Sequence, residues 1–318
     1  MAATLWVAAN CWVGLTAGET LPFDWPARTQ RSTVEHLLEV NLALLQVLLL
    51  MGVVHVITRR RTLPDIAARA PDRALALRET LLLLGYGVLA LGGGFLLATS
   101  SGWHPFGLHL AGTIYGTHAQ LEPAEVLTWA GYNLVVFAVL PLIFFGRRYS
   151  ARALGLRSTD RKNDLLVIVV VLALEATFQI VAVQPEIFTL PAGQLLLGAA
   201  VTFALYLAGA VLPAMVFIYA ILVPRYLTLT GSATTTVLLG GLTYTGLHAW
   251  DAWAVFTSPH GAALSVIFLF FTYLGPGMIK TFLTLRTGNA WVHVWAYHAF
   301  APHTLLDTPH IVDVLRIR

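Results

Sequence analysis

Residues Asp164 to Val183 read DLLVIVVVLALEATFQIVAV, an apolar run with one carboxylate, Glu175, in its interior. About 20 such residues in a helix are enough to cross the hydrocarbon core of a bilayer. Similar runs, bounded by charges, Gly and Pro, recur along the chain, and we predict eight membrane-spanning helices. The other seven runs fall at about Val34 to Ile57, Glu79 to Thr99, Val126 to Phe145, Gly193 to Val223, Ala233 to Trp253, Ala262 to Leu283 and Ala290 to Leu305.

The overall composition agrees with an all-α, polytopic membrane bundle that has no sizeable soluble domain. Of the 318 residues, 57% are hydrophobic and 11% are charged, and the mean hydropathy is +0.74. A soluble domain carries about 25% charged residues. The net charge of +3 is explained by the Lys and Arg that orient membrane proteins, so we expect lipid and not nucleic acid as a partner. The single cysteine, Cys11, excludes a disulfide within these residues and any Cys-rich metal site.

The distribution of Lys and Arg predicts the orientation in a plasma (inner) membrane. Arginines crowd the connections at 59–78 and 147–162, and Arg225, Lys280 and Arg286 fall on the same side of the predicted topology. Positive residues near span ends stay cytoplasmic, so both termini should face outward. Loops 100–125, 184–191 and 254–261 contain no Lys or Arg. The minor exceptions at the termini are Arg28, Arg31, Arg316 and Arg318.

Four regions follow from this topology. Residues 1–33 include a short apolar run that we interpret as an interfacial or partly inserted segment, and residues 34–146 form a three-helix part. Residues 147–305 form a five-helix core, and 306–318 a C-terminal tail. The run from Gly193 is longer than a perpendicular span and contains Pro213, so it should be tilted or broken.

Ionisable residues inside spans are the first candidates for function, because burying them in a bilayer is expensive. They are Glu175, the pair His248 and Asp251, and three histidines of the last run. His248 and Asp251 are three residues apart and would share a helix face, so the carboxylate could orient the imidazole or act beside it. The competing interpretation is a hydrogen-bonded pair at a helix end. Glu175 is a candidate base, or the partner of a histidine.

The histidines of the last run are spaced by five residues. His293, His298 and His303 would each be turned about 140° from the previous one on an α-helix, so at most two should serve one site. His298, beside Trp295 and Tyr297, is the best candidate, although a histidine packed among aromatic rings is also typical of a plain core. In the loop between the second and third spans, His104, His109 and His118 are most simply surface histidines.

From Arg147 to about Pro302, the chain resembles the CAAX prenyl protease and bacteriocin-processing (CPBP, or Abi) family of intramembrane proteases. The segment YSARALGLR at 149–157 looks like the family's entry into its core. YTGLH at 244–248 is similar to its FxxxH motif, and RTGNAW at 286–291 followed by His298 is similar to its third motif. The order and spacing of these segments carry the resemblance.

The resemblance implies a glutamate-dependent endopeptidase, in which a carboxylate of an EExxxR motif activates water beside two histidines. This chain departs from that pattern. Counting back from His248 places Ala214 and Met215 where the family has its glutamates, and Tyr219 where it has its arginine. Pro302 stands where the third motif has asparagine or aspartate.

Three functions therefore remain open. The sequence slightly favours a non-catalytic pseudoprotease that binds a membrane protein, a peptide or a lipid in the former catalytic cavity. The alternative is an active endopeptidase that uses His248 and His298 with a relocated carboxylate, Glu175 or Asp251. That site could include a metal such as zinc, which suits histidine and carboxylate ligands. The third option is a small transporter or a structural subunit of a membrane complex.

Overall fold

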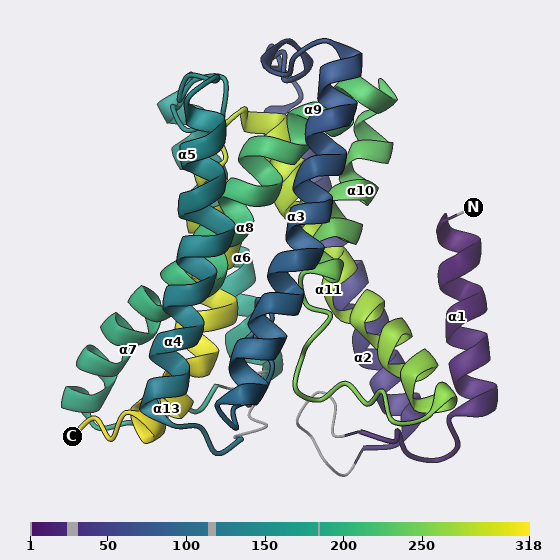
Figure 1. Cartoon of the computed structure of the whole chain (residues 1–318), viewed down its shortest axis with the longest axis vertical. Helices are drawn as coiled ribbons and strands as arrows, with labels where there is room; N and C mark the ends of the chain where they lie inside the picture. The colour runs from purple at the N-terminus through teal and green to yellow at the C-terminus, as the bar shows by residue number, and fades with distance from the viewer. Residues whose placement is uncertain (1, 24–30, 114–118, 184) are drawn as a thin grey trace.

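The structure is a computed structural model that describes residues 2–23, 31–113, 119–183 and 185–318 (Figure 1). Arg28 and His118 lie outside these ranges. The described chain is helical and contains no strand. Its α-helices are α1 (Ala2–Thr16), α2 (Thr33–Thr58), α3 (Arg73–Ser100), α4 (Pro123–Asn133), α5 (Leu140–Gly146), α6 (Arg161–Phe178), α7 (Ala192–Tyr206), α8 (Leu212–Ala214), α9 (Val223–Thr230), α10 (Ala233–Gly246), α11 (Pro259–Thr287), α12 (Trp291–His293) and α13 (Leu305–Val314). Two 3₁₀ turns are η1 (Ala67–Arg69) and η4 (Glu186–Thr189). Six π-helical segments are η2 (Leu134–Val139), η3 (Gln179–Val183), η5 (Leu207–Val211), η6 (Met215–Leu222), η7 (Val294–His298) and η8 (Phe300–Thr304).

Six helical stretches in the described chain are long and apolar enough to cross a membrane. The predicted count of eight is therefore not confirmed. The predicted sixth span ends early, because α10 stops at Gly246 and residues 247–258 form turns. The predicted eighth span is a series of short α and π segments that continues to Val314. The six stretches are Thr33–Thr58, Arg73–Ser100, Pro123–Gly146, Arg161–Val183, Ala192–Thr230 and Pro259–Thr287.

Large apolar side chains cover the outside of this bundle. Leu49 on α2, Leu89 on α3 and Leu165 on α6 are each more than 60% exposed. Soluble monomers rarely expose such continuous apolar surface, whereas a bilayer solvates it without cost. Together with the six long apolar helices, this surface indicates an integral membrane protein.

The centre of the bundle is formed by residues 209–226, which belong to the stretch from α7 to α9 that is continuous over Ala192–Thr230. Every residue from Gly209 to Tyr226 except Leu212 is buried. Pro213 was expected to tilt or break this helix. The helix is not broken, because π-helical segments flank the proline within one continuous stretch. Such segments are one way in which a helix accommodates a residue that lacks an N–H group.

Helices α10 and α11 pack closely because glycines face each other at their contact. A Cβ atom on Gly277 would lie 2.8 Å from the Cα of Gly241. Small residues allow the backbones of membrane helices to approach in this way. The contact fixes Tyr244 on α10 against α11, which positions part of the cavity described below.

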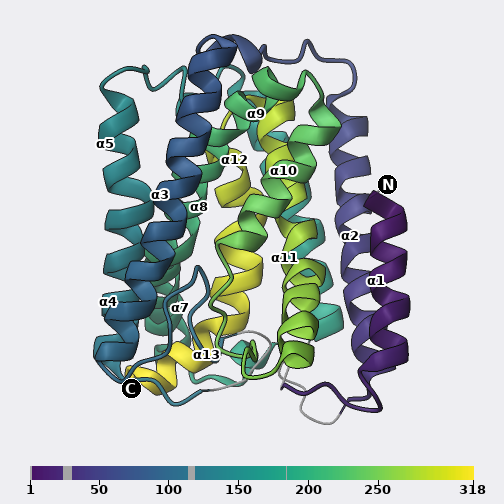
Figure 2. The same cartoon turned by 45° about the vertical axis from the view of Figure 1, so that its right-hand side comes forward.

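The arginine-rich connections lie at one end of the bundle, at the top of Figures 1 and 2, with the C-terminus at the other end. An ion pair between Arg61 and Asp160 joins the two connections, with Nη1 and Oδ2 2.5 Å apart. Which end faces the cytoplasm stays a prediction from charge.

The chain ends are both helical. Helix α1 is too short to span and lies beside α2 (Figure 2), where the Trp6 indole donates to Asn41. Residues 305–314, which we expected to lie largely in a tail, form α13, and His310 and Ile311 on it are buried. The boundary near Arg147 does not separate two cores, because Phe137 and Phe145 belong to the same apolar cluster as Phe217.

Candidate functional site

A small cavity of about 90 Å³ lies inside the bundle, and ionisable side chains form part of its wall. Helices α6, α10 and α11, the π segments η7 and η8, and the loop after α3 all contribute to its wall. Such a volume has room for a few water molecules. Its ionisable and aromatic lining is formed by His109, Glu175, Tyr244, Tyr273, Lys280, Tyr297, His298 and His303.

Two of the three histidines of the last run, His298 and His303, line the cavity, in agreement with the expectation that at most two serve one site. The three rings nevertheless lie close together, because the helix is not a regular α-helix here. Residues 294–298 and 300–304 are π-helical, and the Ala299 amide donates to the Val294 carbonyl at 2.9 Å. Hydrogen bonding from i to i+5 places residues five apart on the same side. The ring centroid of His298 consequently lies 5.7 Å from that of His293 and 5.3 Å from that of His303.

Two of the predicted site residues, Glu175 and His298, line the same cavity. Glu175 is 1% exposed and comes from the last turns of α6, one turn before the helix passes into the π segment η3. Its two carboxylate oxygens accept hydrogen bonds from the side chains of Gln179, at 2.9 Å, and Gln46. The carboxylate is thus held in a fixed position by two neutral amides.

His298 is held from the opposite wall. Its Nε2 lies 3.1 Å from the Tyr244 hydroxyl, while its Nδ1 is buried and has no hydrogen-bond partner among the described residues. Tyr244 also separates His298 from His248, since its ring centroid lies 5.8 Å from the first ring and 4.4 Å from the second. The two predicted histidines are therefore joined through one tyrosine.

His248 follows the end of α10 and has a defined tautomer. Its Nδ1 lies 2.7 Å from the Tyr244 carbonyl oxygen, which can only accept, so Nδ1 carries the proton and Nε2 carries a lone pair. Nε2 has no partner within the described chain. The ring stacks on Tyr273 with 3.8 Å between centroids. The Nε2 lone pair can accept a hydrogen bond.

Asp251 does not orient His248, as the sequence spacing had suggested. Because α10 ends at Gly246, the two residues lie in turns and do not share a helix face. The Asp251 carboxylate instead accepts hydrogen bonds from the Tyr273 hydroxyl and from the Trp253 indole at 3.0 Å. Asp251 is thus connected to the cavity through its hydrogen bond with Tyr273, which lines the cavity.

Sequence reasoning missed Lys280, which we had counted among the charges at the cytoplasmic ends of helices. Helix α11 continues to Thr287, so Lys280 lies within it, is 1% exposed and lines the cavity. Its ammonium nitrogen is 3.7 Å from the Tyr244 ring centroid, a cation–π geometry. Lys280 already lies inside the predicted run from Ala262 to Leu283, three residues from its end. A charge inside a span is the signal that could have identified it.

The loop between α3 and α4 also contributes, and its histidines have different surroundings. His109 lines the cavity, with its ring centroid 5.2 Å from that of His248 and 5.1 Å from that of His303, so it is not a surface residue. His104 lies outside the spans, and its Nδ1 is 2.9 Å from Glu125. The hydrogen bond to Glu125 raises the pKa of His104, against a smaller opposing effect of burial.

The positions that align with the family's acidic motif are apolar and filled. Ala214 and Met215 are buried in the central helix. Tyr219 packs against His293 with 4.2 Å between ring centroids. No group of three or more His, Cys, Asp or Glu residues in the described chain is arranged to hold a metal ion, so these residues offer no preformed zinc site.

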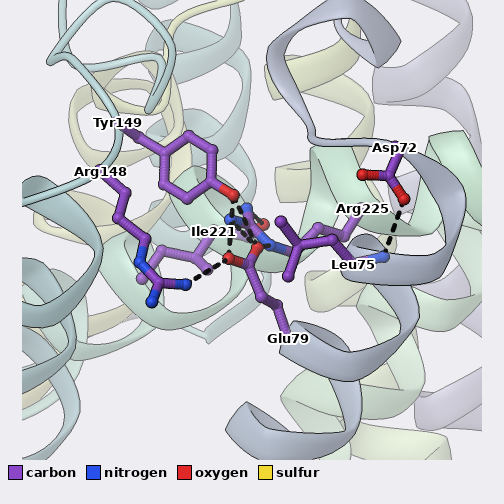
Figure 3. Close-up of polar contacts among 7 residues, drawn as sticks. All are labelled: Asp72, Leu75, Glu79, Arg148, Tyr149, Ile221 and Arg225. Carbon is purple, nitrogen blue, oxygen red and sulfur yellow. Dashed lines mark hydrogen bonds and ion pairs between the residues drawn. The ribbon is translucent and has the colours of Figure 1, made fainter.

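A second buried charged cluster lies nearer the basic end (Figure 3). Glu79 on α3 and Arg225 on α9 form an ion pair, with Arg225 Nη2 2.6 Å and Nε 2.8 Å from Glu79 Oε2. The Tyr149 hydroxyl lies 2.9 Å from the other carboxylate oxygen. Glu79 is therefore a second carboxylate, besides Glu175, that is buried within a long helix. Arg225 lies within helix α9 and not in a connecting loop. Because the buried charges of Glu79 and Arg225 neutralise each other, this cluster indicates a structural role.

The chain was also compared with known proteins. No protein-family model matches it, and no match was found among curated proteins or among solved structures. The function must therefore be argued from the geometry of the cavity.

Proposed function

We propose that the cavity is an acid–base site for hydrolysis within the membrane, in a CPBP-like intramembrane endopeptidase with a relocated carboxylate. One observation carries the proposal. Glu175 and His298, which belong to different spans, line one cavity together with Lys280. A carboxylate on another helix can replace the lost one only if it reaches the same water molecule as the histidine. The shared cavity supports that condition.

Each group has a role that its chemistry permits. Glu175 accepts a proton from a water molecule as the water oxygen attacks the substrate carbonyl carbon, and it returns the proton to the leaving amine. Lys280 and the Tyr244 hydroxyl are donors for the oxyanion that forms. His298 is in hydrogen-bond contact with the Tyr244 hydroxyl and exchanges a proton with it. His248 packs against the Tyr244 ring and acts only through that tyrosine. Asp251 positions Tyr273.

The test is a comparison of protein termini in membranes from cells that express the wild type, Glu175→Gln or His298→Ala. New termini inside transmembrane segments should accumulate only with the wild type, and each variant should lower their formation by about 10²- to 10⁴-fold. His55→Ala is the matched control, because His55 is exposed on α2. Elution of each variant as a folded particle in detergent excludes misfolding. Termini that persist in both cavity variants would reject the proposal.

A non-catalytic pseudoprotease is the second candidate, and the apolar replacements favour it. Ala214, Met215 and Tyr219 leave no acidic group at the positions that the resemblance assigns to catalysis. Under this alternative, purification in mild detergent recovers a stoichiometric membrane protein or lipid, and Glu175→Gln changes no terminus in the membrane. Repeated isolation of a bare monomer would count against it.

A further inference from the structure

A groove of about 630 Å³ lies at the basic end of the bundle. Three segments form it: the α2–α3 connection, the α5–α6 connection with the start of α6, and the end of α11. Four arginines and two aspartates line it, which leaves an excess of two positive charges. These residues are Arg61, Arg69, Arg152, Arg286, Asp65 and Asp160.

Arg69 is held in this groove by backbone and not by a carboxylate. Its Nη1 donates to the Gly288 carbonyl at 2.6 Å. Gly155 and Gly288 adopt positive φ angles of 65° and 69° and pack against the guanidinium, so a Cβ on Gly288 would lie 2.7 Å from Nη2. A guanidinium has five N–H donors. The hydrogen bond to the Gly288 carbonyl uses only some of these donors, and it fixes the plane in which the remaining N–H groups lie.

The other arginines are only partly neutralised. Arg61 pairs with Asp160, and Arg286 Nε donates to the Thr58 hydroxyl at 2.7 Å. Within the described residues, Arg69, Arg152 and Arg286 form no ion pair with a carboxylate. Burial lowers the pKa of Arg69 and the nearby charge of Arg152 lowers it further, against a smaller opposing effect of Asp65. A bound anion would relieve this repulsion.

A polar side chain in the wall of the groove is also available to a ligand. Asn163 is 4% exposed and lines the groove, and its Oδ1 has no hydrogen-bond partner in the described part of the chain. The amide can present either its oxygen or its NH₂ group. Arginine forks match phosphate oxygens in a bidentate manner.

We propose that this groove binds the phosphate group of an anionic ligand, either the headgroup of an anionic phospholipid or a soluble phosphate ester. The place of the groove at the ends of the long apolar helices α2, α6 and α11 puts it at the level of lipid headgroups. Basic pockets between membrane helices on the cytoplasmic side recognise such headgroups.

The test measures thermal unfolding of the purified full-length protein in detergent with added ligand. Three probes are compared at equal phosphorus concentration: phosphatidylglycerol, phosphatidylcholine and glycerol phosphate. The expected result is a rise in Tm with phosphatidylglycerol that exceeds any rise with phosphatidylcholine. A rise with glycerol phosphate and none with phosphatidylglycerol would assign the site to a soluble ester.

Variants connect the effect to the groove. Arg152→Gln should raise the half-saturating ligand concentration about tenfold, which corresponds to about 1.4 kcal/mol. Arg152 is exposed, so its loss should leave the fold intact. Arg60→Gln is the control, since Arg60 is an exposed arginine of the α2–α3 connection that does not line the groove. An equal response of the two variants, or the absence of any shift with the two anionic probes, would overturn the proposal.

Discussion

Replacement of Glu79 by Gln should strongly destabilise the bundle, because it leaves a buried arginine without its counter-ion. The side chains of Glu79 and Arg225 are 5% and 1% exposed. Removing one partner of such a buried pair typically costs about 3 to 5 kcal/mol. Tyr149→Phe should cost less, about 1.5 to 3 kcal/mol, because it removes one hydrogen bond to a charged group. Figure 3 shows these side chains converging on one carboxylate.

The same carboxylate offers a matched control. Arg148 lies 3.8 Å from Glu79, but its side chain is 60% exposed, so Arg148→Ala should cost at most about 1 kcal/mol. The double variant Glu79→Met with Arg225→Met should recover much of the loss, because well-packed apolar residues often replace a buried pair without penalty.

The assay is unfolding in detergent micelles titrated with sodium dodecyl sulfate and followed by tryptophan fluorescence. The free energy of unfolding should fall in the order wild type, Arg148→Ala, Tyr149→Phe, Glu79→Gln. Equal losses for Glu79→Gln and Arg148→Ala would refute the reasoning, since burial would then have no influence. A double variant as unstable as Glu79→Gln would show that packing, and not the unpaired charge, determines the loss.

Two further predictions concern the loop between α3 and α4 and the contact between α10 and α11. His104 has a raised pKa in the folded state, so its contribution to stability is fully present below the ordinary value of 6.5 and is lost as pH rises through the raised value. The difference in unfolding free energy between the wild type and His104→Ala should therefore shrink from pH 6 to pH 9, and a constant difference would contradict this. Gly277→Ala should lower the free energy of unfolding by about 1 to 3 kcal/mol, because its Cβ meets the Gly241 backbone. Gly85→Ala, with open space around it, should be neutral or stabilising by up to about 1 kcal/mol, and similar losses in both would argue against close packing.

The membrane architecture followed from the sequence because apolar runs and their lengths are local properties. The runs around Leu49, Leu89 and Leu165 are long helices with exposed apolar faces. The last third of the chain was harder to predict. Hydropathy alone does not show that α10 ends at Gly246, or that the helix containing His298 changes to π-helical pairing.

The part of the candidate site that the sequence predicted also depends on local properties of the chain. Glu175 and His298 were found because an ionisable group in an apolar run is conspicuous, and they do line one cavity. The partnership of Asp251 with Tyr273, and of Glu79 with Arg225, depends on contacts between distant segments. Spacing along one helix carries no information about such contacts, and it misled the assignment of His248 with Asp251.

The central claim is that Glu175 and His298 act as one unit in the cavity. It is tested most directly by a double-mutant cycle on the turnover of a peptide taken from a cleaved membrane segment. If the two residues serve the same step, Glu175→Gln combined with His298→Ala should be no slower than the slower single variant. Independent, multiplying effects, or full turnover in Glu175→Gln, would contradict the account.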